Sequence, residues 1–180
     1  RMGALRFKAE NDGPFLNDNK SMAAPPWTSL RELAHASLKF EEDNTDDPEY
    51  LKWVALLIAP GSSLGGARPK ASVMDEHNNL WIAKFPSRND DKDIAAWEMV
   101  TNQLAISAGI NVAQGRLLQF NNRYHTYLTK RFDRTIAGER IHFASAMTLL
   151  GHMDGEDAFG ASYLELMEFI SRHGASVEND

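Results

Sequence analysis

The sequence predicts an α+β fold: an antiparallel β-sheet that is preceded by a small helical module and followed by further helices. Two helical patterns occupy the first sixty residues. Four short β-type runs follow in two pairs, each pair is separated by turn residues, and one long helical pattern lies between the pairs. Closely spaced pairs of this kind are typical of antiparallel hairpins. We therefore divide the chain into the end of an amino-terminal subdomain (1–60), a β-rich part (61–143) and the start of a helical part (144–180).

The amino-terminal part is predicted to contain a strand, a turn and two helices. Residues 2–8 alternate as a strand does, and residues 11–14, Asn-Asp-Gly-Pro, indicate a turn. Thr28 is the expected N-cap of a helix over 29–40. Its residues at helical spacing are Leu30, Leu33, Ala34 and Ser37. The Asp47-Pro48 pair then predicts the start of a second helix. Its apolar positions include Leu51, Val54, Ala55 and Ile58.

The later elements follow from alternating turn and periodic segments. Strands are expected over 71–75 and 80–85 around the turn 76–79, and over 116–120 and 124–132 around the turn 121–123. Between the two pairs, residues 92–108 predict the longest helix, which Gly109 ends at the C′ position. Residues 140–143 are a candidate edge strand. The segments 144–150 and 162–172 are predicted to be helical.

The composition of the chain limits the classes of function that it can have. The chain has 180 residues, 43% of them apolar, which is enough for one domain with a core. No apolar run approaches the roughly 18 residues of a membrane helix, no signal peptide opens the chain, and the absence of cysteine excludes disulfides and zinc–thiolate sites. The six histidines show no pair at metal-ligand spacing. A net charge of −6 argues against direct nucleic-acid binding. We expect a cytoplasmic protein without membrane contact, and a piece of a longer one.

A glycine-rich loop is the strongest functional signal. Residues 61–70 are Gly-Ser-Ser-Leu-Gly-Gly-Ala-Arg-Pro-Lys, and their glycines let backbone N–H groups approach an anion. The P-loop pattern fails because Gly66 is followed by Ala67 and Arg68, and the dinucleotide pattern fails because a β-type run, not a helix, follows Lys70. A glycine loop followed by a lysine on the next strand, here Lys84, is the arrangement of protein kinases, although their G-x-G-x-x-G spelling is absent.

Lys84 and Glu98 are the candidate charged pair. Each also has an interpretation without function. Lys84 could be a surface lysine whose aliphatic stem covers apolar surface, and Glu98 could lie at the edge of the apolar stripe and pair with a surface lysine or with nothing. The next helix carries one apolar stripe, and Glu98 lies at its edge. The stripe consists of Ile94, Trp97, Thr101, Leu104, Ala105 and Ala108. Because a carboxylate that leans toward the core needs a cation, we expect Glu98 to pair with Lys84.

Two further strings have open interpretations. Ser62 and Ser63 are either ordinary loop hydroxyls or a phosphorylation site, where the added charge would compete with ATP phosphates for the same N–H groups. The string Tyr127-Leu-Thr-Lys-Arg-Phe-Asp-Arg134 is either functional or an edge strand protected by charged side chains.

Taken in order, these pieces resemble the HipA family of serine/threonine kinases, the toxin halves of bacterial type II toxin–antitoxin pairs. The resemblance covers nearly the whole chain. The residues that carry it are the 61–70 loop, Ile82-Ala-Lys84-Phe-Pro86, Trp97-Glu98 with Leu104-Ala105 and Gly109-Ile110, Arg131-Phe-Asp-Arg134, Leu149-Leu-Gly151 and Ser162-Tyr163.

The resemblance implies a kinase-like small lobe that binds ATP between the glycine loop and a hinge. It implies that Lys84 contacts phosphate, that Glu98 is its helix partner, and that Lys130 and Phe132 offer hinge backbone groups to adenine. Within the loop it implies roles for Gly65 and Gly66 and autophosphorylation of Ser63. Lys70 matches the lysine that ends the family's loop, with a role that the sequence leaves open. Partners would be a helix-turn-helix antitoxin and a protein substrate.

One departure from the family bears on activity. HipA-like kinases carry a D-x-H-x-K-N string and then a metal-binding aspartate in a D-x-R or similar string, and neither occurs between Asp133 and Asp180. Asp154 and Asp157 lack the required neighbours. We therefore expect no catalytic residue and no Mg²⁺ ligand in this chain, and expect it to be inactive alone. The alternative is a non-catalytic regulatory module that binds an antitoxin-type partner.

Overall fold

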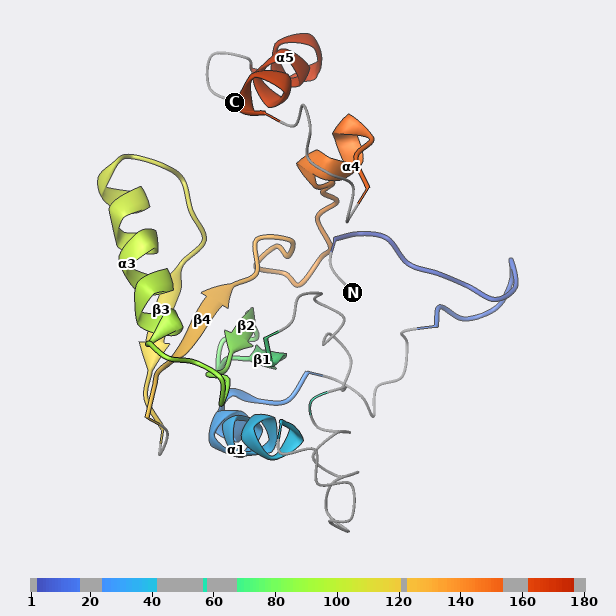
Figure 1. Cartoon of the computed structure of the whole chain (residues 1–180). Helices are drawn as coiled ribbons and strands as arrows, with labels where there is room; N and C mark the ends of the chain where they lie inside the picture. Colours follow the sequence, from blue (N-terminus) through green and yellow to red (C-terminus); the bar gives the residue numbers. More distant parts are fainter. Residues whose placement is uncertain are drawn as a thin grey trace. The chain divides into compact units, whose positions relative to one another are not determined.

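The computed structural model describes residues 3–16, 24–41, 57, 68–120, 123–153 and 162–176 (Figure 1). They belong to two compact units, Arg1–Ile141 and His142–Asp180. Within the described ranges, no helix is both long enough and apolar enough to cross a lipid bilayer. The expected second helix and most of the glycine loop lie outside these ranges, except that Leu57 is helical and buried.

The first unit is built on a four-stranded antiparallel sheet, which confirms the predicted α+β class. The strands are β1 (Lys70–Met74), β2 (Leu80–Lys84), β3 (Gly115–Leu118) and β4 (Thr126–Lys130), in the order β1-β2-β4-β3. Each lies within a few residues of its predicted range. Two hairpins therefore join at β2 and β4, which become the central strands.

The strand register sorts the side chains onto two faces. Lys84 of β2 is opposite Lys70 of β1 on one side and Tyr127 of β4 on the other. Because directly opposite residues share a face, these three form one row, and we call their side of the sheet the lysine face. The other side, the core face, carries Val73 and Trp81, which are opposite each other and buried.

The core lies between the core face and the helix α1 (Leu30–Phe40), which Figure 1 shows beneath β1 and β2. The predicted inward positions are confirmed, since all four are buried: Leu30, Leu33, Ala34 and Ser37. The expected Thr28 cap is wrong. A 3₁₀ turn, Trp27–Ser29, precedes α1 and moves the helix start to Leu30, and Ser29 caps it without a side-chain hydrogen bond.

The β1–β2 hairpin turns within the predicted range 76–79, and Asp75, which was expected to end the strand, closes it. The Asp75 carboxylate accepts hydrogen bonds from the backbone N–H groups of His77 and Asn79 and from the Trp81 indole N–H, at 2.9, 2.8 and 2.9 Å. Asn78 takes the left-handed conformation, with φ 61°, that this turn requires. Burial opposes ionisation of Asp75, but these donors outweigh it and lower its pKa to about 2.

A buried charge cluster follows β4. Asp133 is fully buried and accepts hydrogen bonds from Arg131 at 2.8 and 2.7 Å, from Arg134 at 2.7 Å and from the backbone N–H of Gly3 at 2.6 Å. Despite burial, these donors lower the Asp133 pKa to about 2. The interpretation of this string as protective charges on an edge strand is wrong, since β4 is central and Arg131 is buried.

Acid is expected to destabilise the fold through these two carboxylates. Their pKa values of about 2 lie below the roughly 3.9 of an unfolded aspartate, so their stabilisation is present above pH 4 and is lost as the pH falls toward 2. Denaturant titrations at pH 7, 4 and 3 should give a falling free energy of unfolding. Asp75→Asn should flatten that dependence, whereas an unchanged slope would contradict this account.

Two predicted strands, over 2–8 and 140–143, do not form within the described residues. Residues 2–8 do not form a strand in the described part, because Gly3 has φ 67° and only one bridge, Lys8 to Phe15, pairs this segment with the chain beyond the 11–14 turn. Residues 140–143 likewise contribute a single bridge, Arg140 to Arg134, where the chain turns back at Gly138.

The second unit contains α4 (Ala146–Leu150) and α5 (Tyr163–His173), close to the predicted helices. Ser145 and Ser162 cap them through their side chains, which accept from the N–H groups of Thr148 and Glu165. His152, just after α4, lies 3.0 Å from the Glu165 carboxylate of α5, so an ion pair joins the two helices when His152 is protonated.

Candidate functional site

The site begins with one ion pair on the lysine face. Lys84 ends β2, and its Nζ lies 2.6 Å from Oε2 of Glu98, which belongs to α3 (Ile94–Ser107). This contact is the pairing that the strand-then-helix order predicts. Both side chains are about one-third exposed, so the pair remains accessible to a ligand.

Lys70 adds a second cation to the same row. Burial, and then the positive charges of Lys84 and Arg68, hold the pKa of the Lys70 ammonium below its usual value. On the other side of Lys84, the Tyr127 ring centre lies 5.6 Å from Nζ, and burial followed by the charge of Glu98 raises the pKa of its hydroxyl. An anion between the two lysines would relieve their repulsion, which is a chemical fit to phosphate.

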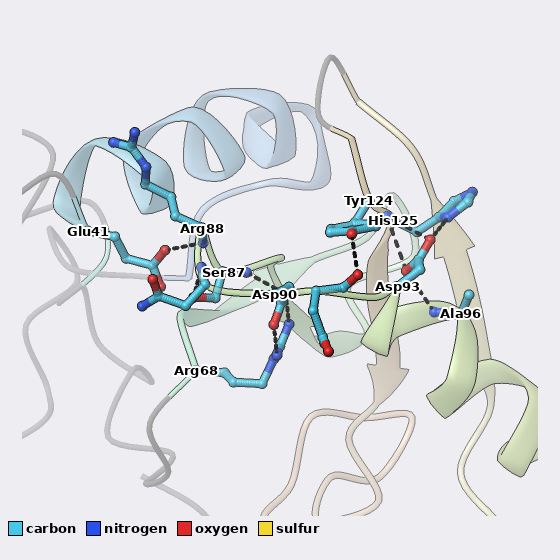
Figure 2. A network of polar contacts seen from close by, with 11 residues as sticks. Glu41, Arg68, Ser87, Arg88, Asp90, Asp93, Ala96, Tyr124 and His125 are labelled. Atoms are coloured by element: carbon cyan, nitrogen blue, oxygen red, sulfur yellow. Dashed lines mark hydrogen bonds and ion pairs between the residues drawn. The ribbon is translucent and has the colours of Figure 1, made fainter.

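Helix α3 is held in place by the residues just before its start (Figure 2). The Asp93 carboxylate accepts from the Ala96 N–H at 3.0 Å, which caps the helix, and also contacts the imidazole of His125 just before β4. The Tyr124 hydroxyl donates to the Asp91 carbonyl at 2.8 Å. At the other end, Gly109 has φ 78°, which confirms it as the residue that ends the helix.

None of the six residues in the predicted apolar stripe of α3 is buried, so the expectation that this stripe faces the core is wrong. Trp97 is 61% exposed and Leu104 is 64% exposed, while Ala95 is the buried residue of this helix. Helical spacing predicts which residues share a face but not whether another element covers that face. An open groove of about 420 Å³ runs along it, lined in part by Glu98, Ala105 and Tyr127.

The two predicted hinge residues have different surroundings. The Lys130 N–H donates to the Gln114 carbonyl at 2.9 Å, and its side chain belongs to the core face, opposite Trp81. Any backbone contact from Lys130 to a base must therefore use its carbonyl oxygen. Phe132 lies beyond the end of β4 and is 57% exposed.

The predicted loop residues Ser62, Ser63, Gly65 and Gly66 lie outside the described residues, so their roles stay predictions. The described part of the loop starts at Arg68, whose guanidinium binds both carboxylate oxygens of Asp90 at 2.6 and 2.5 Å. Within the described ranges, no three histidine, aspartate or glutamate side chains gather as a metal site.

Sequence reasoning missed Asp90, Asp93 and His125. A signal existed for Asp93, because aspartate is a favoured N-cap, but the helix start was placed at Lys92. The pairing of Asp90 with Arg68 and that of His125 with Asp93 carry no local signal, since the two partners are 22 and 32 residues apart.

Together, a four-stranded antiparallel sheet and a helix-borne glutamate paired with a strand lysine define an α+β protein with a charged, anion-compatible face. The comparison with protein families agrees. The HipA-like C-terminal domain matches residues 62–180, well over half of the chain, and the chain therefore belongs to the HipA family. That family is associated with kinase activity and with toxin–antitoxin systems. The chain matches no curated protein and no solved structure.

Proposed function

We propose that this chain is the ATP-binding portion of a HipA-like serine/threonine protein kinase. The observation that carries the proposal is the 2.6 Å pair between Lys84 and Glu98, with Lys70 beside it on the lysine face. In kinases, a strand lysine held by a glutamate of the next helix faces the nucleotide phosphates.

In this proposal ATP lies between the glycine loop and the residues after β4. Lys84 and Lys70 bind phosphate oxygens, and Glu98 orients the Lys84 ammonium. Backbone groups of Gly65 and Gly66 approach the phosphates, while the Lys130 carbonyl and the Phe132 backbone face the adenine. Mg²⁺ would neutralise phosphate charge, and the D-x-R string that would hold it does not occur in this sequence. Because the D-x-H-x-K-N and D-x-R strings are absent, we propose that this chain alone does not transfer phosphate.

The family context extends the proposal to a partner. A helix-turn-helix antitoxin would supply the DNA contact that a chain with net charge −6 does not favour, and both proteins would act in the cytoplasm. The exposed apolar residues of α3, Trp97 and Leu104, favour the alternative that this chain is itself a partner-binding regulatory module.

The test is calorimetric titration of the chain with Mg·ATP. Saturable binding is expected, and Lys84→Ala should weaken it at least about tenfold, because a charge-assisted hydrogen bond contributes about 1.5–3 kcal/mol. Lys92→Ala removes the same charge from an exposed position outside the site and should bind as the wild type does. Absence of binding in the wild type, or equal binding in the wild type and Lys84→Ala, would overturn the proposal and favour the regulatory module.

A further inference from the structure

Asp90 belongs to a turn that is fixed independently of the glycine loop. Its carboxylate accepts from the Ser87 N–H at 2.8 Å, and its own N–H donates to the Ser87 carbonyl at 3.2 Å. The next residue of the turn, Arg88, donates its N–H to the Glu41 carboxylate beyond α1 at 2.6 Å. Figure 2 shows these contacts together, and they make the connection between β2 and α3 a fixed support.

Arg68 attaches the end of the glycine loop to this support. Its two guanidinium nitrogens reach the two Asp90 oxygens, a planar bidentate geometry that a lysine cannot reproduce. The Asp90 side chain is 8% exposed, so the ion pair is shielded from solvent on that side. Hydrogen bonds from Arg68 outweigh burial and lower the pKa of Asp90, which keeps its charge at neutral pH.

The next two residues continue the attachment. The Pro69 carbonyl accepts from the Phe85 N–H at 3.0 Å, and Lys70 enters β1 opposite Lys84. Residues 68–70 are therefore bound to two parts of the chain: strand β2, which carries Lys84, and the connection that follows β2. The proline ring also fixes φ at this point. The exit of the loop is held against the same segment that presents the lysine pair.

We propose that Asp90 is a positioning residue for the proposed nucleotide site: through Arg68 it fixes residues 68–70 at the carboxyl end of the glycine loop, so that Lys70 faces the phosphates. This inference rests on the proposed function. Arg68 is neutralised by Asp90 and acts as a tether. A direct contact between Arg68 and phosphate is the competing account.

Asp90→Ala distinguishes the two accounts because it frees Arg68. If Arg68 is a tether, this variant weakens Mg·ATP binding about tenfold, and Arg68→Ala weakens it to the same degree. The double variant should show no further loss, since both changes remove one contact. Adenosine, which has no phosphates, should bind equally to all of them. Unchanged or tighter Mg·ATP binding by Asp90→Ala, or a parallel loss of adenosine binding, overturns the proposal. Asp12→Ala is the matched control, because it removes an exposed aspartate that makes none of these contacts, and it should bind as the wild type does.

Hydrogen exchange tests the tether without a nucleotide. In the free chain, amides in the peptide that contains residues 68–70 should exchange faster in Asp90→Ala and Arg68→Ala, whereas Lys84→Ala should leave them unchanged. Arg68→Lys should fall between the wild type and Arg68→Ala. If the wild type binds no ATP but exchange changes as expected, the proposed function fails while the tether stands. If exchange is the same in the wild type and Asp90→Ala, the tether is absent.

Discussion

Replacing Asp133 with alanine is expected to reduce the free energy of unfolding by about 3–5 kcal/mol, because it removes the carboxylate that pairs with the buried Arg131 charge. The Arg131 side chain is only 2% exposed, and its Nη1 also lies 3.4 Å from the Ser72 hydroxyl. Since small proteins are stable by about 5–15 kcal/mol, much of the chain should be unfolded at moderate denaturant concentration. Chemical denaturation followed by circular dichroism measures the loss.

Two further variants identify the cause. Asp12→Ala removes an exposed aspartate and should cost less than about 0.5 kcal/mol. Replacing Arg131 with methionine and Asp133 with leucine together should cost much less than Asp133→Ala, because buried ion pairs can be exchanged for apolar side chains of similar volume. If the double variant were as unstable as the single one, the buried Arg131 charge that has lost the Asp133 carboxylate would not be the cause.

Trp81→Ala is expected to destabilise the chain by a similar amount, about 3–5 kcal/mol, for a different reason. Trp81 is 1% exposed in the core between the sheet and α1, and its ring meets the Trp27 ring edge-on with centroids 5.5 Å apart. The substitution leaves a cavity and also removes the indole donor of Asp75.

Trp81→Phe separates these two effects. Phenylalanine fills most of the space but cannot donate to Asp75, so we expect a loss of about 1–2 kcal/mol, in the range of one hydrogen bond and a small cavity. Thermal unfolding monitored at a wavelength insensitive to tryptophan compares the variants. A cost below about 1 kcal/mol for Trp81→Ala would show that this core position can collapse around the missing ring.

Local patterns were sufficient for most of the sheet and for the Lys84–Glu98 pair. Strand alternation and turn residues identified β1 to β4, and helical spacing placed Glu98 where a lysine on the preceding strand could reach it. These features depend on residues within about one hairpin or one helix. The inward face of α1 was predictable for the same reason.

Contacts between distant segments were not predictable. Nothing near Asp90 indicates that it binds Arg68, and nothing near Asp133 indicates Gly3 as a donor. The exposure of Trp97 shows the same limit, since a stripe of apolar residues does not state what covers it. Periodic patterns describe residues within one helix or strand, so they do not indicate which residues meet across a long stretch of the sequence.

The bond from Gly3 to Asp133 spans 130 residues of the chain. It can form only after all four strands have been synthesised and the chain has passed β4. Closing so long a loop costs more conformational entropy than forming either hairpin, and the hairpins and α1 therefore have an entropic advantage in forming early. During synthesis the segment around Gly3 would remain undocked, and Asp133 would be bound by the adjacent Arg131 and Arg134 before Gly3 reached it.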